Sequence, residues 1–181
     1  MQILLLREWV RKTMICSDMQ GNNDEKGCDI TVVRAKIEMY CSRAEQCVSA
    51  VRKKLQQWHV PAQDADRIVE ELEAEGFIDE SRFATAFAHD RLKFGKCGRN
   101  KIRYELYQKH IVEKHVAEAL LSLDEQLYAD TLHSVAQAKF RALKTLAPDE
   151  QRRKLTAFLL SRGFETELIY KEINRVIKNK E

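Results

Sequence analysis

The chain has 181 residues, of which 44% are hydrophobic and 33% are charged, and its formal net charge is +3. The hydrophobic fraction is sufficient for a buried core, but 2 prolines and 6 glycines are too few for the many turns of a β-sandwich or an α/β protein of this length. The five cysteines are odd in number and none has C-x-x-C spacing, which argues against a disulfide framework or a zinc site. Composition therefore predicts long helices joined by short loops.

The first 30 residues differ in character from the rest of the chain. The apolar run from Ile3 to Leu6 has only four residues, too few for a secretory signal or a membrane span. A loop-like stretch follows at residues 21–27. We expect residues 1–30 to be an N-terminal extension that is disordered or not native, on a cytoplasmic protein with no membrane partner.

From Thr31 onward, apolar residues recur with the period of an α-helix, and we predict nine helices. Ser42 and Glu45 have the spacing of a capping box, which predicts Ser42 as the N-cap of the second helix. We expect Asp79 to cap the fourth helix and Pro148 to begin the eighth. The predicted ranges are 31–41, 43–58, 62–75, 80–94, 98–109, 113–121, 125–146, 149–161 and 165–178.

These helices form three similar units, because one spacing of apolar residues occurs three times. The pattern is apolar-x3-apolar-x4-apolar, and its copies lie 51 and then 53 residues apart. The three copies are Val51-Leu55-Val60, Ile102-Leu106-Ile111 and Leu155-Leu159-Phe164. We therefore predict an all-α fold of three tandem three-helix repeats, at residues 31–78, 79–124 and 125–181, that stack into an elongated, curved array.

The repeated spacing also predicts how the second helix of each repeat ends. In a Schellman ending, one residue after the helix adopts positive φ and the next apolar residue packs back on the last turn. His59, His110 and Gly163 occupy the positive-φ position in the three copies. Histidine is among the residues enriched at positive φ, so this ending accounts for two histidines without invoking a metal.

Charged residues are segregated along the chain. Residues 64–80 hold eight acids and one base, residues 89–115 hold eight bases and three acids, and the segment from Lys139 onward holds eleven bases and six acids. Bases recur near the start of the second helix of each repeat, since Arg99 matches Arg152 and Arg103 matches Arg52. The candidate partner-binding or nucleic-acid-binding residues are Arg52, Arg91, Lys93, Lys96, Arg99, Lys101, Arg103, Arg152, Arg153 and Lys154.

A stripe of bases suits phosphate groups or an acidic protein groove. Lysine and arginine are also good surface helix formers, and this plainer interpretation of the bases stays open. The sequence contains no Walker loop, no G-x-G-x-x-G, no G-x-S-x-G and no H-E-x-x-H motif. We therefore expect no catalytic residue, no cofactor and no bound metal.

The middle repeat resembles the RecX regulatory proteins. Residues 76–84, Gly-Phe-Ile-Asp-Glu-Ser-Arg-Phe-Ala, resemble the family signature G-h-I-D-D-x-x-F-A, with glutamate in place of the second aspartate. The stretch that follows resembles the family pattern R…G…I…E-L…K-G-I, carried by Arg91, Gly98, Ile102, Glu105, Leu106, Lys109 and Ile111. His110 occupies a position where the family often has glycine. The resemblance extends over residues 33–178.

The resemblance implies a non-enzymatic regulator that binds filaments of the RecA recombinase on single-stranded DNA and inhibits recombinase activities in DNA repair. It also implies a RecA filament as the partner, with single- or double-stranded DNA as a further partner, and we expect a monomer. The alternative is an independent nucleic-acid-binding helical protein or a helix-turn-helix regulator. A helix that reads base edges needs suitable polar side chains, whereas the second and third helices offer mostly acids or bases.

Overall fold

The computed structural model describes residues 29–178, and in this part of the chain the regular structure is entirely helical. The predicted N-terminal extension lies outside the described residues up to residue 28. The helices are α2 (Ile30–Arg43), α3 (Val48–Gln57), α4 (Ala62–Ala74), α5 (Glu80–Lys93), α6 (Arg99–Tyr107), α7 (Glu113–Leu121), α8 (Glu125–Ala142), α9 (Pro148–Ser161) and α10 (Thr166–Lys178).

The helix ends confirm the predicted Schellman motifs. His59, His110 and Gly163 have φ of 56°, 65° and 83°. In each repeat the next backbone N–H donates to the carbonyl five residues before it, and the three donors are Val60, Ile111 and Phe164. The three acceptor residues, Leu55, Leu106 and Leu159, are completely buried, so the repeated leucine anchors each unit.

Two of the three predicted helix starts are confirmed. Asp79 accepts a hydrogen bond from the backbone N–H of Arg82 at 2.9 Å, and this bond lowers the pKa of Asp79. Pro148 is the first residue of α9. The prediction for Ser42 is wrong, because α2 continues through Arg43 and the Ser42 hydroxyl donates back to the carbonyl of Met39. The N-cap of α3 is Cys47 instead.

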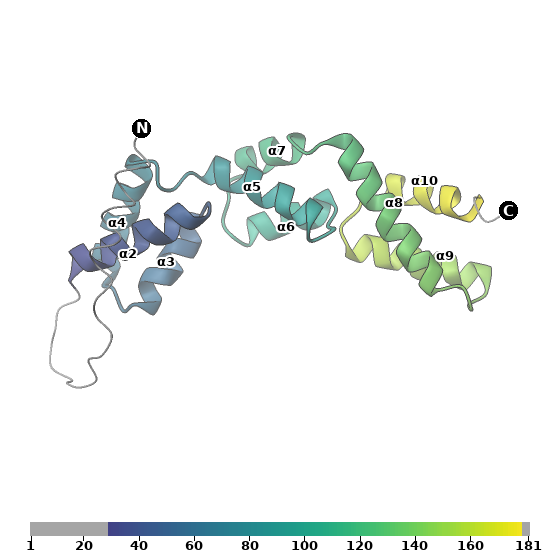
Figure 1. The fold of residues 1–181 in the computed structure, drawn as a ribbon, viewed down its shortest axis with the longest axis horizontal. Coiled ribbons are helices and arrows are strands. Elements are labelled where there is room, and N and C mark those ends of the chain that lie inside the picture. Colours follow the sequence, from purple (N-terminus) through teal and green to yellow (C-terminus); the bar gives the residue numbers. More distant parts are fainter. Residues whose placement is uncertain (1–28, 179–181) are drawn as a thin grey trace.

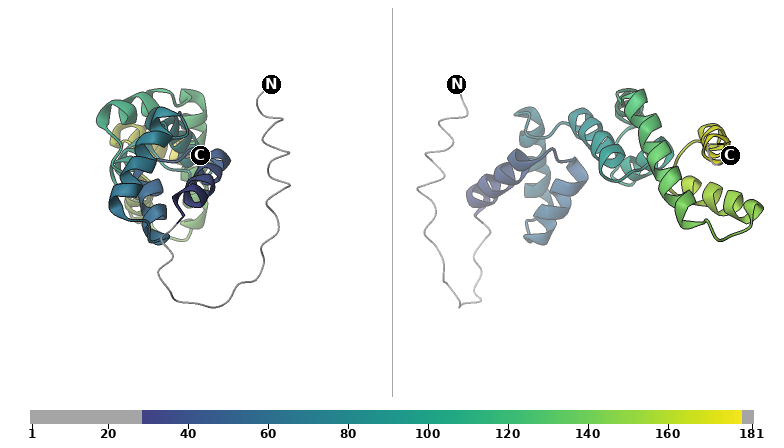
Figure 2. Two further views of the ribbon diagram at one scale, coloured as in Figure 1. Left: turned by 90° about the vertical axis from the view of Figure 1, so that its left-hand side faces the viewer. Right: turned by 45° about the vertical axis from the view of Figure 1, so that its right-hand side comes forward.

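The repeats stack into an elongated, curved array, as predicted (Figure 1). Figure 2 shows the same row of helices end-on in its left view and obliquely in its right view. The buried residues form two clusters. One fills the interior of α2–α4, and the other runs without a break through α5–α10 and includes Cys47. The second and third repeats therefore share one core, while the first repeat has its own.

Candidate macromolecule-binding edge

The second helices of the three repeats, α3, α6 and α9, follow one another along the lower edge of the array in Figure 1. We call this the second-helix edge. The Ser49 hydroxyl at the start of α3 donates to the carbonyl of Lys109 just beyond α6, at 2.8 Å. The backbone N–H groups of Gly98 and Asn100 at the start of α6 donate to the carbonyls of Arg162 and Gly163 just beyond α9. Both α3 and α6 thus begin where the second helix of the following repeat ends.

The junction between the second and third repeats is the tighter one. Gly98 and Gly163 lie so close that a Cβ on either would overlap the other repeat's backbone. The guanidinium of Arg162 also donates to the carbonyl of Gly95, at 3.1 Å. The close approach of two backbones therefore requires glycine at residue 98. This gives a structural reason for the glycine in the family pattern R…G…I…E-L…K-G-I.

Arg99 lies inside this junction. Its guanidinium pairs with Glu125 at 2.6 Å and with Glu165 at 3.2 Å, and its side chain is 18% exposed. The guanidinium carbon is also 4.1 Å from the ring centroid of Tyr128. Burial and the hydrogen bond to Glu165 raise the pKa of Tyr128, so its hydroxyl stays protonated and donates to that carboxylate. Arg99 therefore holds two repeats together and has little charge free for a partner.

Five further predicted bases have polar partners within the chain. Arg52 pairs with Asp66 at 3.0 Å, and Arg91 pairs with Glu105 at 2.6 Å. In the third repeat the carboxylate of Glu150 faces Lys154 at 2.9 Å and Arg153 at 4.0 Å. Arg152 donates to the side chain of Asn174 at 3.1 Å. These pairs are partly or largely exposed, so a partner of high charge density can compete for the bases.

The remaining four bases have no carboxylate partner within residues 29–178, and all belong to the middle repeat: Lys93, Lys96, Lys101 and Arg103. Lys101 and Arg103 lie on α6, and Lys96 is exposed in the turn that precedes it, with φ of 52°. The ammonium of Lys93 lies 5.4 Å from the ring centroid of Phe94. The stripe predicted from the sequence is thus uneven, with its unpaired charge concentrated in the middle repeat.

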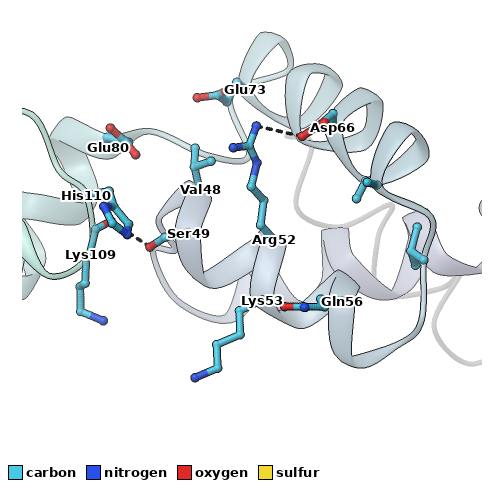
Figure 3. Close-up of a pocket in the computed structure, with 13 residues that line it drawn as sticks. Val48, Ser49, Arg52, Lys53, Gln56, Asp66, Glu73, Glu80, Lys109 and His110 are labelled. Atoms are coloured by element: carbon cyan, nitrogen blue, oxygen red, sulfur yellow. Dashed lines mark hydrogen bonds and ion pairs between the residues drawn. The ribbon is translucent and has the colours of Figure 1, made fainter.

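A hollow of about 840 Å³ opens beside α3, where the first and second repeats meet (Figure 3). Lys53 and Lys109 extend from its rim on one side, and Arg52 reaches toward Asp66 on the other. Glu80 also lines the hollow, and burial raises the pKa of its carboxyl group. The prediction omitted Lys53 and Lys109, although Lys53 directly follows Arg52 in the repeat pattern.

The second-helix edge also carries two exposed tyrosines that the prediction omitted. Tyr104 is 61% exposed and Tyr107 is 43% exposed, and both lie on α6. The sequence could have indicated that Tyr104 is exposed. It lies two residues from both Ile102 and Leu106, which places it on the side of the helix opposite these two core residues. Within residues 29–178, no group of three or more histidine, cysteine, aspartate or glutamate side chains is arranged to hold a metal ion.

The fold and this edge define an all-α protein of three-helix repeats with basic residues along one edge. None of the helices among the described residues has the length and apolar character needed to cross a bilayer. The models for the second and third three-helix domains of RecX match residues 79–120 and 126–173. A curated "Regulatory protein RecX" from Chlorobium phaeobacteroides is 31% identical over 162 residues, which cover 89% of this chain and all of that protein. The chain therefore belongs to the RecX family of regulatory proteins.

Other similar proteins agree with this assignment. The RecX of Clostridium beijerinckii is 30% identical over 129 residues, and that of Clostridium tetani is 32% identical over 114 residues. The matches cover 70% and 62% of this chain but only 60% and 52% of those two relatives. The crystal structure of RecX from Lactobacillus salivarius has the same fold, with a TM-score of 0.71 at 18% identity, covering 82% of this chain and 96% of that one.

Proposed function

We propose that this regulator acts on the RecA recombinase, without a catalytic site of its own. It binds along the RecA–single-stranded DNA filament and inhibits the recombinase activities. Family membership supports the choice of partner. The observation that carries the proposal is the end-to-end alignment of α3, α6 and α9, which places one basic helix per repeat along a single edge.

An array of this kind suits a helical polymer. Because each repeat presents its second helix in the same way, one molecule can contact several places along a filament at once. Weak contacts that form together raise the total affinity far above that of any one contact. We propose that residues 31–78, 79–124 and 125–181 are these three contact units and that the protein acts as a monomer.

The unpaired bases of the middle repeat provide the main electrostatic attraction in this proposal. Lys96, Lys101 and Arg103 need not break an existing ion pair to approach phosphate or carboxylate groups. The bases of the third repeat and Arg52 contribute less, because each must first leave a polar partner. The attraction between the edge and the filament should weaken as the salt concentration rises.

The test is a variant with Lys96→Ala, Lys101→Ala and Arg103→Ala, assayed for inhibition of RecA ATP hydrolysis on single-stranded DNA. Individual exposed charges contribute on the order of 0.2–1 kcal/mol, so the variant should need roughly 3 to 150 times more protein for half inhibition. The control is Lys36→Ala, Arg141→Ala and Lys178→Ala, which removes three exposed bases from α2, α8 and α10. Circular dichroism should show equal helicity in both.

Inhibition that is unchanged in the first variant across a range of salt would remove this edge from the mechanism. Equal loss of inhibition in both variants would show that only net charge matters. Should the unaltered protein bind naked DNA tightly and ignore the filament, it is an independent nucleic-acid-binding protein and the RecA proposal is wrong.

A further inference from the structure

The exposed surface of α6 combines aromatic rings with unpaired cations. Tyr104 and Tyr107 are three residues apart and therefore lie on the same side of the helix, one turn from each other. Ile102 and Leu106 on the opposite side are completely buried, so the core does not account for the tyrosines. Arg103 lies between the two sides and has no carboxylate partner among the described residues.

The two tyrosines are held differently. The hydroxyl of Tyr107 donates to the carboxylate of Glu113 at the start of α7, which fixes its ring against the neighbouring helix. The Tyr104 side chain has no hydrogen-bond partner or ring contact within residues 29–178, and 61% of the residue is exposed. The ring of Tyr104 is therefore available to a binding partner. The ring of Tyr107, one turn away, is held in place by its hydrogen bond to Glu113.

We propose that α6 is a stacking surface for the bases of a single-stranded nucleic acid, with the ring of Tyr104 lying against one base. Arg103 and Lys101 flank this ring on the helix and would contact the adjacent phosphates. Proteins that bind single strands combine aromatic platforms with cations that follow the backbone in this way. This inference rests on the proposed function, in which the second-helix edge binds the filament. It adds that α6, the middle helix of that edge, contacts the bases of the single strand.

The surface chemistry favours a single strand over a duplex or an acidic protein. In a duplex the faces of the bases are covered by their neighbours, so a tyrosine ring cannot stack on them without unstacking the helix. An acidic protein groove would satisfy the cations but would leave the ring of Tyr104 without an aromatic or apolar counterpart. Each nucleotide of a single strand offers an accessible base face and a phosphate. These two groups match the tyrosine rings and the neighbouring arginine and lysine on α6.

The experiment measures binding of the full chain to three fluorescent probes of equal length: an oligo(dT) strand, an abasic deoxyribose-phosphate strand and a duplex. The unaltered protein should prefer oligo(dT) over the abasic strand at the same salt concentration. Tyr104→Ala should weaken oligo(dT) binding roughly 5- to 150-fold, which corresponds to about 1–3 kcal/mol for one stacked base. Binding of Tyr104→Ala to the abasic strand should equal that of the unaltered protein.

Two controls separate the ring from other effects. Tyr104→Phe keeps the ring and should keep the preference for oligo(dT). Leu121→Ala removes another large apolar side chain, 85% exposed at the end of α7, and should change neither affinity. Arg103→Ala should weaken binding to oligo(dT) and the abasic strand alike, because phosphate contacts do not depend on bases.

Equal binding of oligo(dT) by the Tyr104→Ala variant and the unaltered protein would overturn the inference, as would an equal loss on the abasic strand. A Tyr104→Ala variant that loses only inhibition of RecA would place Tyr104 against protein and would also overturn it. The proposed function is tested separately by RecA ATP hydrolysis. Stacking on oligo(dT) without inhibition would therefore leave this inference intact while the RecA proposal fails.

Discussion

Glycine is favoured in this chain for two separate reasons, a positive φ angle and a close contact with another backbone. Gly76 shows the first reason alone, and Gly163 shows both. Gly76 and Gly163 both follow a helix end with positive φ, 76° and 83°. A Cβ at Gly76 would meet open space, whereas one at Gly163 would overlap the backbone of Lys101 in the preceding repeat. Two histidines adopt the same conformation at the ends of α3 and α6.

This difference predicts unequal costs for the same substitution. Gly76→Ala should lower the free energy of unfolding by about 1–2 kcal/mol, the penalty for a side chain in the left-handed region. Gly163→Ala should cost about 1–3 kcal/mol more, because the junction must also move apart. Urea titration followed by circular dichroism measures both values. Equal losses in the two variants would show that the close approach of Lys101 to Gly163 adds no penalty for a side chain there.

At the scale of helices, the sequence predicted a residue's role correctly where that role depends only on residues close to it in the chain. The Schellman endings, the Asp79 cap and the buried leucines were all predictable from spacing. Ser42 was not, because its hydroxyl can cap a new helix or close an old one, and both choices satisfy the same spacing. The sequence also could not predict that Arg99 forms ion pairs within the protein, since its partner Glu165 is 66 residues away and belongs to another repeat.

Arg99 and Arg103 lie one turn apart on α6, and substitution by alanine should destabilise the protein at Arg99 but not at Arg103. Arg99→Ala removes hydrogen bonds to two carboxylates at the junction and should lower the free energy of unfolding by about 1.5–3 kcal/mol. Arg103→Ala removes an exposed, unpaired charge and should change that energy by no more than about 0.5 kcal/mol. Thermal or urea unfolding of the two variants is the measurement. An unchanged free energy of unfolding in Arg99→Ala would show that Arg99 does not stabilise the junction.

Over the whole molecule, the two junctions differ because their equivalent residues differ. Cys47 occupies in the first repeat the place that Gly98 occupies in the second, four residues before Val51 and Ile102 respectively. The Cys47 side chain is buried, and this junction is joined by the Ser49 hydroxyl where the other is joined by two backbone N–H groups. The core is divided at this same junction, with α2–α4 on one side and α5–α10 on the other.

This asymmetry predicts that the array opens in two steps under native conditions. Amide hydrogens of α2–α4 should exchange through an opening of lower free energy than those of α5–α10, because the first repeat shares little of its core with its neighbour. Hydrogen exchange at low denaturant, resolved by peptide mass spectrometry, measures each helix. Gly163→Ala should then divide α5–α10, so that α5–α7 and α8–α10 also exchange separately. Exchange of all nine described helices at one common free energy would contradict this prediction and show that the three repeats open together as one unit.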